Sequence, residues 1–253
     1  SDLGNGTTTD DVLAIYNPST RQRTVVGVDA RNPVFLNNKV YFQQSEAVAR
    51  KDLNGDGDAR DVVLSVYDPA TRQVESLGME CAMGFLAAGD WLLTRTSEAA
   101  QGNRDLNGDR DNQDEVAQLY QISQKKWINT TLESSFDVAL TPKLAIVGVD
   151  ERKQGNKDLN GDGDMLDVVA HIWDLTIADA DPVAHIINTG QDCSGGVDAD
   201  GGIAAFVTAE AAQGNKDLNM DQDTEDDVAQ AFILAEKKVV NIGRDASGGI
   251  AVG

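Results

Sequence analysis

The residues best suited to chemistry in this chain are aspartates at alternate positions of four short segments. Each segment reads Asp-x-Asn-x-Asp-x-Asp-x-x-Asp. The candidate metal ligands are Asp52, Asn54, Asp56, Asp58 and Asp61; Asp105, Asn107, Asp109, Asp111 and Asp114; Asp158, Asn160, Asp162, Asp164 and Asp167; and Asp217, Asn219, Asp221, Asp223 and Asp226. Oxygen atoms at every second residue of a tight loop can converge on one point, which suits calcium with its six to eight oxygen ligands. We therefore expect about four bound Ca²⁺ ions, one in each loop.

Other interpretations of these segments are weaker. Magnesium prefers fewer protein ligands in stricter octahedral geometry, and zinc would require His or Cys, which these loops lack. A solvated turn would explain one such loop, but four loops of the same phase would repel themselves without a cation. Glycine is favoured at the sixth position for a sharp turn. Arg110 and Gln222 replace it, so we expect weaker calcium binding in the second and fourth loops.

The loops belong to a repeat of about 53 residues. A large aromatic residue follows each loop at a fixed distance, and a worn copy of the loop, from Asp2 to Asp10, opens the chain. We expect no tight metal site in that copy, because Gly4, Gly6 and Thr8 stand between its two aspartates. An acidic residue also precedes each intact loop and could complete the metal shell, brace the loop or lie on the surface. The aromatic positions are Tyr16, Tyr67, Tyr120, Trp173 and Phe232, and the acidic ones are Glu46, Glu98, Glu151 and Glu210.

The interior of the repeat indicates four short strands and no long helix. In one repeat we expect strands at 34–36, 40–43, 62–67 and 74–77, and in the next at 85–88, 91–96, 116–122 and 127–131. Four antiparallel strands repeated about five times predict an all-β protein. The favoured architecture is a β-propeller of about five four-stranded blades, with the Asp-rich loops between the second and third strands. A β-solenoid or a linear array is the alternative.

We expect a single propeller domain over residues 1–253. The repeat phases are approximately 1–27, 28–80, 81–133, 134–192 and 193–245, and 246–253 start a blade shared with the N-terminus. That blade would either close with three strands or belong to a longer chain.

The loops also resemble those of a known group of proteins. The segment Asp-Leu-Asn-Gly-Asp-Gly at 52–57 looks like the first half of an EF-hand loop. It resembles still more the Asp-x-Asp-x-Asp-Gly-x-x-Asp calcium loops of integrin α-subunit propellers and bacterial FG-GAP (VCBS-type) repeats. The resemblance implies that Asp52, Asn54, Asp56 and Asp61 bind metal through side chains and that residue 58 offers its carbonyl, with the same roles in the other loops. Two departures are the last Asp, at the tenth position instead of the ninth, and the missing Phe-Gly…Gly-Ala-Pro signature.

Composition narrows the possible functions. The formal charge of −21 argues against nucleic-acid binding and against anionic membrane surfaces, and it favours cationic partners. No apolar run is long enough to span a bilayer. The chain opens without a basic or apolar leader, so we expect that any signal peptide has been removed. Four Ca²⁺ ions would reduce the net charge to about −13. A secreted or surface-displayed protein in a calcium-rich exterior fits this balance.

We therefore expect a non-enzymatic calcium-binding propeller in which Ca²⁺ stabilises the loops, with a role in adhesion, recognition or assembly. Its ligand would be a protein or a glycan, and it could be part of a larger surface assembly or fibre. The alternative is a calcium-dependent hydrolase or lyase with a site at the central channel. The candidate residues for that site are Asp29, Arg31, Asp137, Asp198 and Asp200.

Other residues point less clearly to function. Cys81 and Cys193 share one phase of the repeat and would form either a disulfide or two buried thiols. His171 and His185 lie in no catalytic pattern, so packing or surface roles are expected. The recurring aromatic residues could line a ligand belt, but their fixed phase favours packing between blades.

Overall fold

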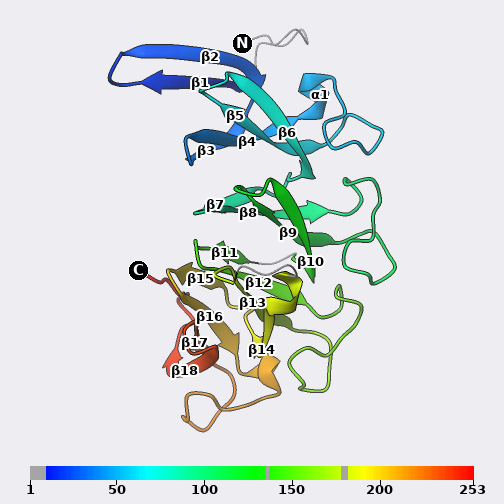
Figure 1. The fold of residues 1–253 in the computed structure, drawn as a ribbon. Helices are drawn as coiled ribbons and strands as arrows, with labels where there is room; N and C mark the ends of the chain where they lie inside the picture. Colours follow the sequence, from blue (N-terminus) through cyan, green and yellow to red (C-terminus); the bar gives the residue numbers. More distant parts are fainter. Residues whose placement is uncertain (1–9, 135–136, 178–181) are drawn as a thin grey trace. The chain divides into compact units, whose positions relative to one another are not determined.

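The computed structural model describes residues 10–134, 137–177 and 182–253. These residues form one two-stranded sheet and four four-stranded sheets, all antiparallel, whose strands are labelled and coloured by sequence in Figure 1. The two-stranded sheet pairs β1 (Val12–Asn17) with β2 (Gln22–Asp29). The four-stranded sheets are β3 (Arg31–Leu36), β4 (Lys39–Ser45), β5 (Val62–Asp68) and β6 (Gln73–Glu80); β7 (Phe85–Ala88), β8 (Trp91–Ser97), β9 (Glu115–Gln121) and β10 (Lys126–Glu133); β11 (Val138–Leu140), β12 (Leu144–Asp150), β13 (Val168–Asp174) and β14 (Ile186–Asp192); and β15 (Val197–Asp200), β16 (Ile203–Ala209), β17 (Asp227–Ile233) and β18 (Lys238–Asp245).

Each four-stranded sheet is a meander in which neighbours in sequence are neighbours in space. The central second and third strands are buried on both faces, as in β12, where all seven residues are buried. β-Branched and aromatic residues fill these strands, while Gly and Asn form the turns. This is the four-stranded unit of a β-propeller blade. The all-β prediction with Asp-rich loops between second and third strands is confirmed, and the five sheets match the expected five phases.

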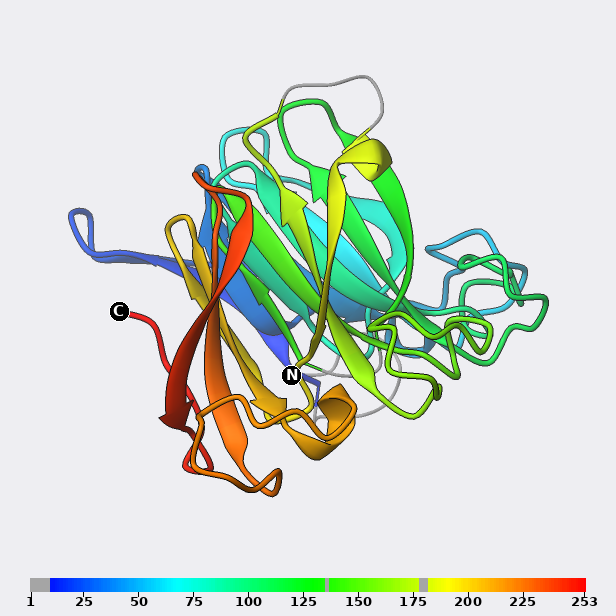
Figure 2. The ribbon, with the colours of Figure 1, turned by 90° about the horizontal axis from the view of Figure 1, so that it is seen from below.

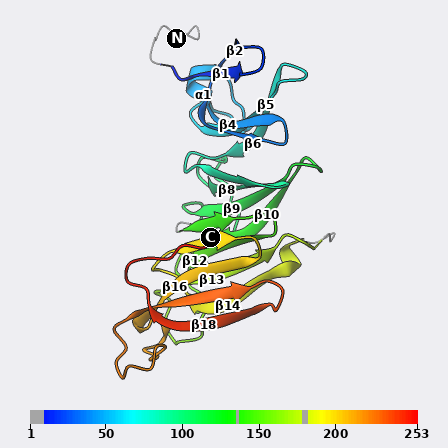
Figure 3. The ribbon, with the colours of Figure 1, turned by 90° about the vertical axis from the view of Figure 1, so that its left-hand side faces the viewer.

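The chain forms two compact units, and each has its own apolar core. The first unit comprises the residues up to 85 together with 96–104, and the second comprises 86–95 and 105–253. In the first unit, Phe42 and Tyr67 pack with Leu13 of the two-stranded sheet. In the second unit, one cluster joins β8, β9 and β10 to β12 and β13, and another joins β12 and β13 to β16 and β17. Figure 3 shows these sheets one after another.

The structure differs from the sequence-based expectation in small ways. Several strands extend one to three residues beyond the expected bounds. Short helical turns occur at α1 (Glu46–Ala49), η1 (Pro182–His185) and η2 (Ala211–Gln213). Residues 246–253 form no strand. The worn loop copy at 2–10 lies outside the described residues except for Asp10. The single-domain assignment stays a prediction.

The recurring aromatic residues pack inside the sheets. Tyr67, Tyr120, Trp173 and Phe232 are all buried, and Tyr120 lies 5.0 Å from Trp127 between ring centroids. Tyr16 of the two-stranded sheet is the exception and is 60% exposed. These side chains therefore fill the cores, and the fixed phase reflects packing, as the sequence favoured.

Candidate metal-binding loops

The four acidic loops share one backbone shape, which their own side chains stabilise. In the third loop, residues 158–167, Asp158 accepts the amides of Gly161 at 2.6 Å and Gly163 at 3.2 Å, one on each carboxylate oxygen. The Oδ1 atom of Asn160 accepts the amide of Asp162 at 3.1 Å. Equivalent bonds form at the same positions of the other three loops. The alternation of Asp and Asn thus folds each loop into consecutive side-chain-capped turns.

A buried glutamate precedes each loop, and in the first, third and fourth loops its carboxylate braces the loop backbone. Glu151 is fully buried, and its Oε1 atom accepts the amides of Leu159 at 2.5 Å and Asn160 at 3.3 Å. Its Oε2 atom accepts the amide of Asp167 at 3.3 Å, so one carboxylate joins the start of the loop to its end. Glu46 and Glu210 make the same three bonds in the first and fourth loops. The bracing role is therefore the one that these hydrogen bonds support.

The same glutamates stand beside the last aspartates of their loops. Each group has three carboxylate oxygens, one from each residue, that lie within 4.8 Å of one another. Oxygens at this spacing could share one hard cation. The four groups are Glu46, Asp58 and Asp61; Glu98, Asp111 and Asp114; Glu151, Asp164 and Asp167; and Glu210, Asp223 and Asp226.

The last aspartate of the loop carries the electrostatic strain. Burial raises the pKa of Asp167 to about 7, with further upward contributions from the charges of Asp162 and Asp164. Burial and the nearby charge of Asp56 raise the pKa of Asp61 to about 6. In both loops an Asn side chain opposes this effect by donating a hydrogen bond to the carboxylate. Without a cation, these carboxyls hold a proton at a pH where an ordinary aspartate is ionised.

The fourth loop, residues 217–226, differs in detail. Met220 and Gln222 stand where the third loop has glycines, and both have positive φ, +67° and +85°. The hydrogen bond between Asp221 and Asp226 is the largest cause that raises the pKa of Asp226, and it helps to lower the pKa of Asp221. A proton shared within this pair offsets part of the charge that a metal would otherwise neutralise.

Each of the first three loops also contacts the repeat that follows it. The Nδ2 atom of the loop asparagine donates to a backbone carbonyl of the next repeat, from Asn54 to Ala100 at 3.0 Å and from Asn107 to Lys153 at 3.0 Å. The third bond runs from Asn160 to Ala212 at 2.9 Å. In Figure 2, the loops before β9 and β13 project on the same side of the second unit.

The receiving turn has the sequence Gln-Gly-Asn in three repeats, at 101–103, 154–156 and 213–215. Its glycine lies against the loop: a Cβ atom on Gly102 would be 3.1 Å from the Cβ of Asp56, and one on Gly214 would be 3.1 Å from the Cβ of Asp162. Both glycines also have positive φ. The turn therefore accepts the neighbouring loop only because it carries no side chain there.

The glutamine of this turn fastens the preceding sheet. The Oε1 atom of Gln213 accepts the amide of Asp192 at 2.8 Å, and its Nε2 atom donates to the carbonyl of Gly190 at 2.9 Å. Gln101 and Gln154 make the same pair of bonds to the ends of β6 and β10. Sequence reasoning missed this turn, although the recurrence of Gln-Gly-Asn just before the loops was the signal that could have revealed it.

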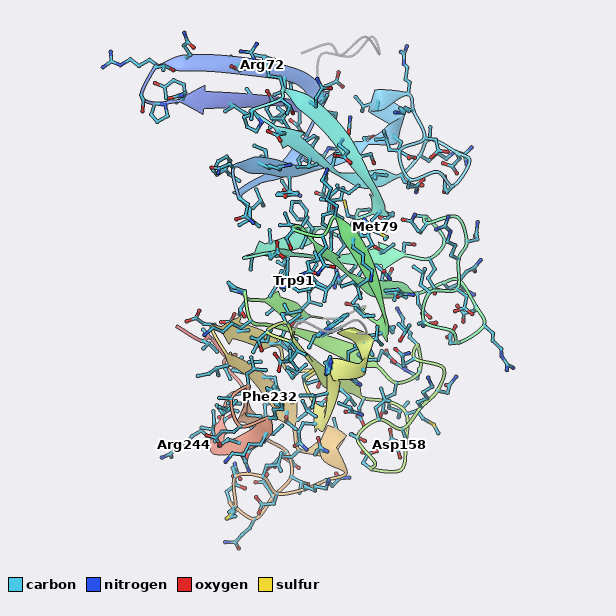
Figure 4. The ribbon with its side chains drawn as sticks, in the orientation of Figure 1. Arg72, Met79, Trp91, Asp158, Phe232 and Arg244 are labelled. Atoms are coloured by element: carbon cyan, nitrogen blue, oxygen red, sulfur yellow. The ribbon has the colours of Figure 1, made fainter. Side chains whose placement is uncertain are left out.

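The structure brings together only part of the predicted ligand set. The seventh and tenth positions place their carboxylates beside the bracing glutamate, whereas the first, third and fifth positions accept loop amides. Figure 4 labels Asp158, at the start of the third loop. The glutamates were noticed in the sequence but not counted among the ligands. That all of these residues bind metal stays a prediction.

The candidate channel residues have ordinary structural surroundings. Asp29 is buried and accepts the amide of Ser45 at 3.1 Å. Asp198 accepts the amides of Ala199 and Val252. Arg31, Asp137 and Asp200 are exposed. The hydrolase or lyase alternative stays a prediction without support from these contacts.

The cysteines and histidines contribute no site chemistry in the described residues. Cys81 and Cys193 are free and buried, so the two-thiol alternative holds here. Burial raises the pKa of each thiol above its ordinary value. His171 is buried, which lowers its pKa, and its Nδ1 atom lies 3.0 Å from the carbonyl oxygen of Val169.

The chain is similar at low identity to several solved structures. No family model matches it, and no curated protein matches it. The propeller domain of the Trilobed protease from Pyrococcus furiosus is 12% identical, with 91% of this chain covering 63% of that chain at a TM-score of 0.49. TolB from Acinetobacter baumannii is 13% identical. The match covers 93% of this chain and 50% of that chain, with a TM-score of 0.40. The acylaminoacyl peptidase from Pyrococcus horikoshii is 12% identical. The match covers 91% of this chain and 34% of that chain, with a TM-score of 0.46. The chain thus spans less than two thirds of each of these proteins.

Proposed function

We propose that this protein is a non-enzymatic calcium-binding β-propeller protein in which Ca²⁺ holds the acidic loops in place. The observation that carries the proposal is the recurrence, in four separate repeats, of three carboxylates with oxygens within 4.8 Å of one another. Such groups repel one another unless they are protonated or share a cation. Three of these aspartates have raised pKa values: burial and neighbouring charges raise those of Asp61 and Asp167, and the hydrogen bond with Asp221 is the largest cause at Asp226.

Calcium is the ion that best suits the ligands. All the candidate side chains offer oxygen, and the described loops contain neither His nor Cys. The spacing Asp-x-Asn-x-Asp resembles the calcium loops of EF-hands and of integrin and FG-GAP propellers, which adds support at the level of sequence. The bracing glutamate, which reaches its loop from the end of the second strand, would supply an additional oxygen. We propose about four ions, with tighter binding where glycine occupies the sixth position.

The biological role that follows is adhesion, recognition or assembly outside the cell. A calcium concentration of about 1 mM would fill roughly half to nine tenths of sites with the affinity found in extracellular modules. The acidic surface and the loops that project from the sheets would form a metal-stabilised surface to which a protein or glycan ligand binds. No helix among the described residues could cross a membrane.

The test is thermal unfolding of the whole chain with chelator and with excess calcium. Metal that binds only the folded loops stabilises them by mass action, so we expect a higher melting temperature in calcium, and loss of that increase in chelator. Isothermal titration would measure about four ions for each chain. An identical melting curve in both conditions would refute the proposal.

A matched control separates specific binding from charge screening. The triple variant Asp61→Asn, Asp167→Asn, Asp226→Asn keeps side-chain size and removes one negative charge from each of three loops. We expect this variant to bind fewer ions, with most of the calcium-dependent increase lost. The triple variant Asp68→Asn, Asp90→Asn, Asp245→Asn carries the same charge change outside the loops and should keep the full calcium response. Equal responses in the two variants would indicate general charge screening instead.

A further inference from the structure

The first unit contains a pocket of about 240 Å³ whose chemistry is opposite to that of the acidic loops. One wall comes from β1 and β2, and the other comes from the end of β5 and the turn that follows it. The chain has a formal charge of −21, yet Arg72 is the only charged residue that lines this pocket. Its volume is below that of a drug-sized pocket and suits one small ring.

The pairing of β1 with β2 places one row of side chains on the pocket side of the hairpin. Ile15 pairs with Thr24, and Asn17 pairs with Gln22. Directly opposite residues of an antiparallel pair point to the same face, as do residues two apart along one strand. All four residues line the pocket. The hairpin therefore contributes amides and a hydroxyl, with one apolar side chain among them.

Tyr67 forms the buried part of the opposite wall. It is 3% exposed, and it packs with Leu13 and Val40 in the apolar core of this unit. Its hydroxyl has no hydrogen-bond partner among the described residues and is not sealed from solvent, so it opens into the pocket that Tyr67 lines. A hydroxyl in such a buried position costs free energy unless it is hydrogen-bonded. This atom therefore requires a partner within the pocket.

Packing does not explain the hydroxyl of Tyr67. Phe232 occupies the equivalent position in the β15–β18 sheet, where it pairs with Val239 as Tyr67 pairs with Val74. Phe232 is buried to the same degree without any polar atom in its side chain. A phenyl ring is thus sufficient for the core at this position of the repeat. The hydroxyl is an addition of the second repeat, at the place where the pocket lies.

Arg72 supplies a positive charge that no protein carboxylate neutralises. Its guanidinium is exposed and makes no ion pair or hydrogen bond with the part of the chain that the structure describes. The carboxylate of Asp68, at the start of the same turn, is already paired with Lys39 at 3.3 Å and accepts the amide of Ala70 at 2.8 Å. Figure 4 labels Arg72 beside the β1–β2 hairpin. The guanidinium is therefore available to a ligand.

This lining fits a ligand that carries several hydroxyl groups and one carboxylate. A guanidinium binds a carboxylate through two parallel N–H donors, and hydroxyl and amide side chains bind ligand hydroxyls as donors or acceptors. A cation is disfavoured, because the pocket has a guanidinium and no carboxylate. A bare anion would use Arg72 but would leave Tyr67 and Ile15 without a function. A sugar acid uses them all, because its ring has hydroxyls at the edge and C–H groups on its faces.

We infer that this pocket binds one acidic sugar unit, with the carboxylate of the sugar on Arg72 and a ring hydroxyl on the hydroxyl of Tyr67. The inference does not rest on calcium binding, because no residue of the pocket belongs to an acidic loop. It stands if the loops bind no metal. Calcium binding likewise stands if the pocket binds no sugar.

The test is an NMR titration of the whole chain in chelator with three probes: methyl β-glucuronoside, methyl β-glucoside and acetate. We expect the glucuronoside to shift the backbone amides of residues 15–24 and 67–73. It should bind about tenfold more tightly than the glucoside, which lacks the carboxylate, and about tenfold more tightly than acetate, which lacks the ring. Unshifted amides in these two segments would overturn the inference. Acetate binding as tight as that of the glucuronoside would also overturn it.

Two arginine variants separate a local contact from general attraction. Arg72→Gln should bind the glucuronoside and the glucoside with equal affinity, since the charge that distinguishes them is gone. Arg23→Gln is the matched control: Arg23 pairs with Tyr16, so it lies on the face of the hairpin that points away from the pocket. This variant should keep the tenfold preference. An equal loss of preference in both variants would mean that overall charge attracts the sugar, and would overturn the assignment to Arg72.

A third variant tests the hydroxyl of the tyrosine. Tyr67→Phe should keep the melting temperature, because Phe232 fills the equivalent position, and it should weaken the binding of both sugars about fivefold. Tyr120→Phe removes the equivalent hydroxyl of the next sheet, outside the pocket, and should leave both affinities unchanged. Equal affinities in Tyr67→Phe and the natural chain would show that the hydroxyl does not contact the sugar, and the inference would fail.

Discussion

The third and fourth acidic loops have the same ligand spacing, but they differ in the residues at their tight turns and in the hydrogen-bond partners of their asparagines. In the third loop, Gly161 and Gly163 adopt φ values of +78° and +107°, which glycine adopts without strain. In the fourth loop, Met220 and Gln222 adopt +67° and +85°. Such values cost a residue with a side chain about 1 kcal/mol or more.

The junctions differ as well. Asn160 donates across to Ala212, whereas Asn219 turns back to the aspartates of its own loop. The comparison teaches that the Asp and Asn spacing maintains the loop backbone in both cases, while the presence or absence of glycine determines how much backbone strain the loop carries. We therefore expect the third loop to be the better calcium site and the fourth to be the more independent of calcium.

The largest effect should come from the part that the two loops share. Glu151→Ala and Glu210→Ala each remove a buried carboxylate that accepts three loop amides. Loss of these bonds should lower the free energy of unfolding by about 3 kcal/mol in either variant. Urea unfolding in chelator measures this loss. A much smaller loss for Glu210→Ala would mean that the fourth loop does not depend on its brace.

The next effect should come from exchanging the turn residues. Met220→Gly with Gln222→Gly removes backbone strain from the fourth loop, so its calcium affinity should rise about five- to tenfold, from about 1 kcal/mol of strain released. The reverse exchange, Gly161→Met with Gly163→Gln, should weaken the third loop by a similar factor. Site-resolved titration by NMR measures both affinities. Unchanged affinities would show that turn strain does not control the sites.

A smaller effect should distinguish the asparagines. Asn160→Ala removes a donor to the next repeat and to Asp167, and should cost about 1 kcal/mol for each hydrogen bond lost. Asn219→Ala removes bonds only within its own loop, so the amides of the neighbouring strands should keep their protection. Hydrogen exchange of β16 in both variants tests this. Faster exchange in both would place the coupling between repeats elsewhere.

The smallest effect concerns pH. The pKa of Asp167 is raised to about 7, so its proton stabilises the metal-free protein fully below about pH 4 and progressively less as the pH rises through 7. Melting temperatures in chelator should therefore fall over this range, and Asp167→Asn should flatten the curve. Calcium should reverse the trend, because the metal competes with the proton. Parallel curves for the variant and the natural chain would contradict this assignment.

Much of the fold could be read from the sequence because several signals recur together. Turn residues, alternating strands and one buried aromatic such as Trp173 repeat in phase, and each constrains the same four-stranded unit. The loop positions followed from the aspartate spacing alone. The spacing could not predict where each side chain points. That direction depends on which backbone N–H groups lie nearby, and their positions follow from the fold and not from residue type.

The bracing glutamates and the glutamine turns show why the rest was missed. Glu151 acts on its loop from the end of the second strand, and Gln154 acts on the preceding sheet, so neither belongs to the segment whose pattern drew attention. Both recur as faithfully as the aspartates. A recurrence by itself does not say whether a side chain binds an ion, an amide or a neighbouring sheet, and here that distinction required the geometry.

The glutamine turns also have a consequence for how the chain folds. Each glutamine reaches partners only 21 and 23 residues earlier in the sequence, and the acidic residue whose amide it binds accepts a strand amide from 17 residues later. Closing such short loops costs little chain entropy. The contacts that join one sheet to the next can therefore form soon after each sheet does, without waiting for distant parts of the chain. Contacts so close in sequence favour fast folding that begins in any repeat and spreads to its neighbours.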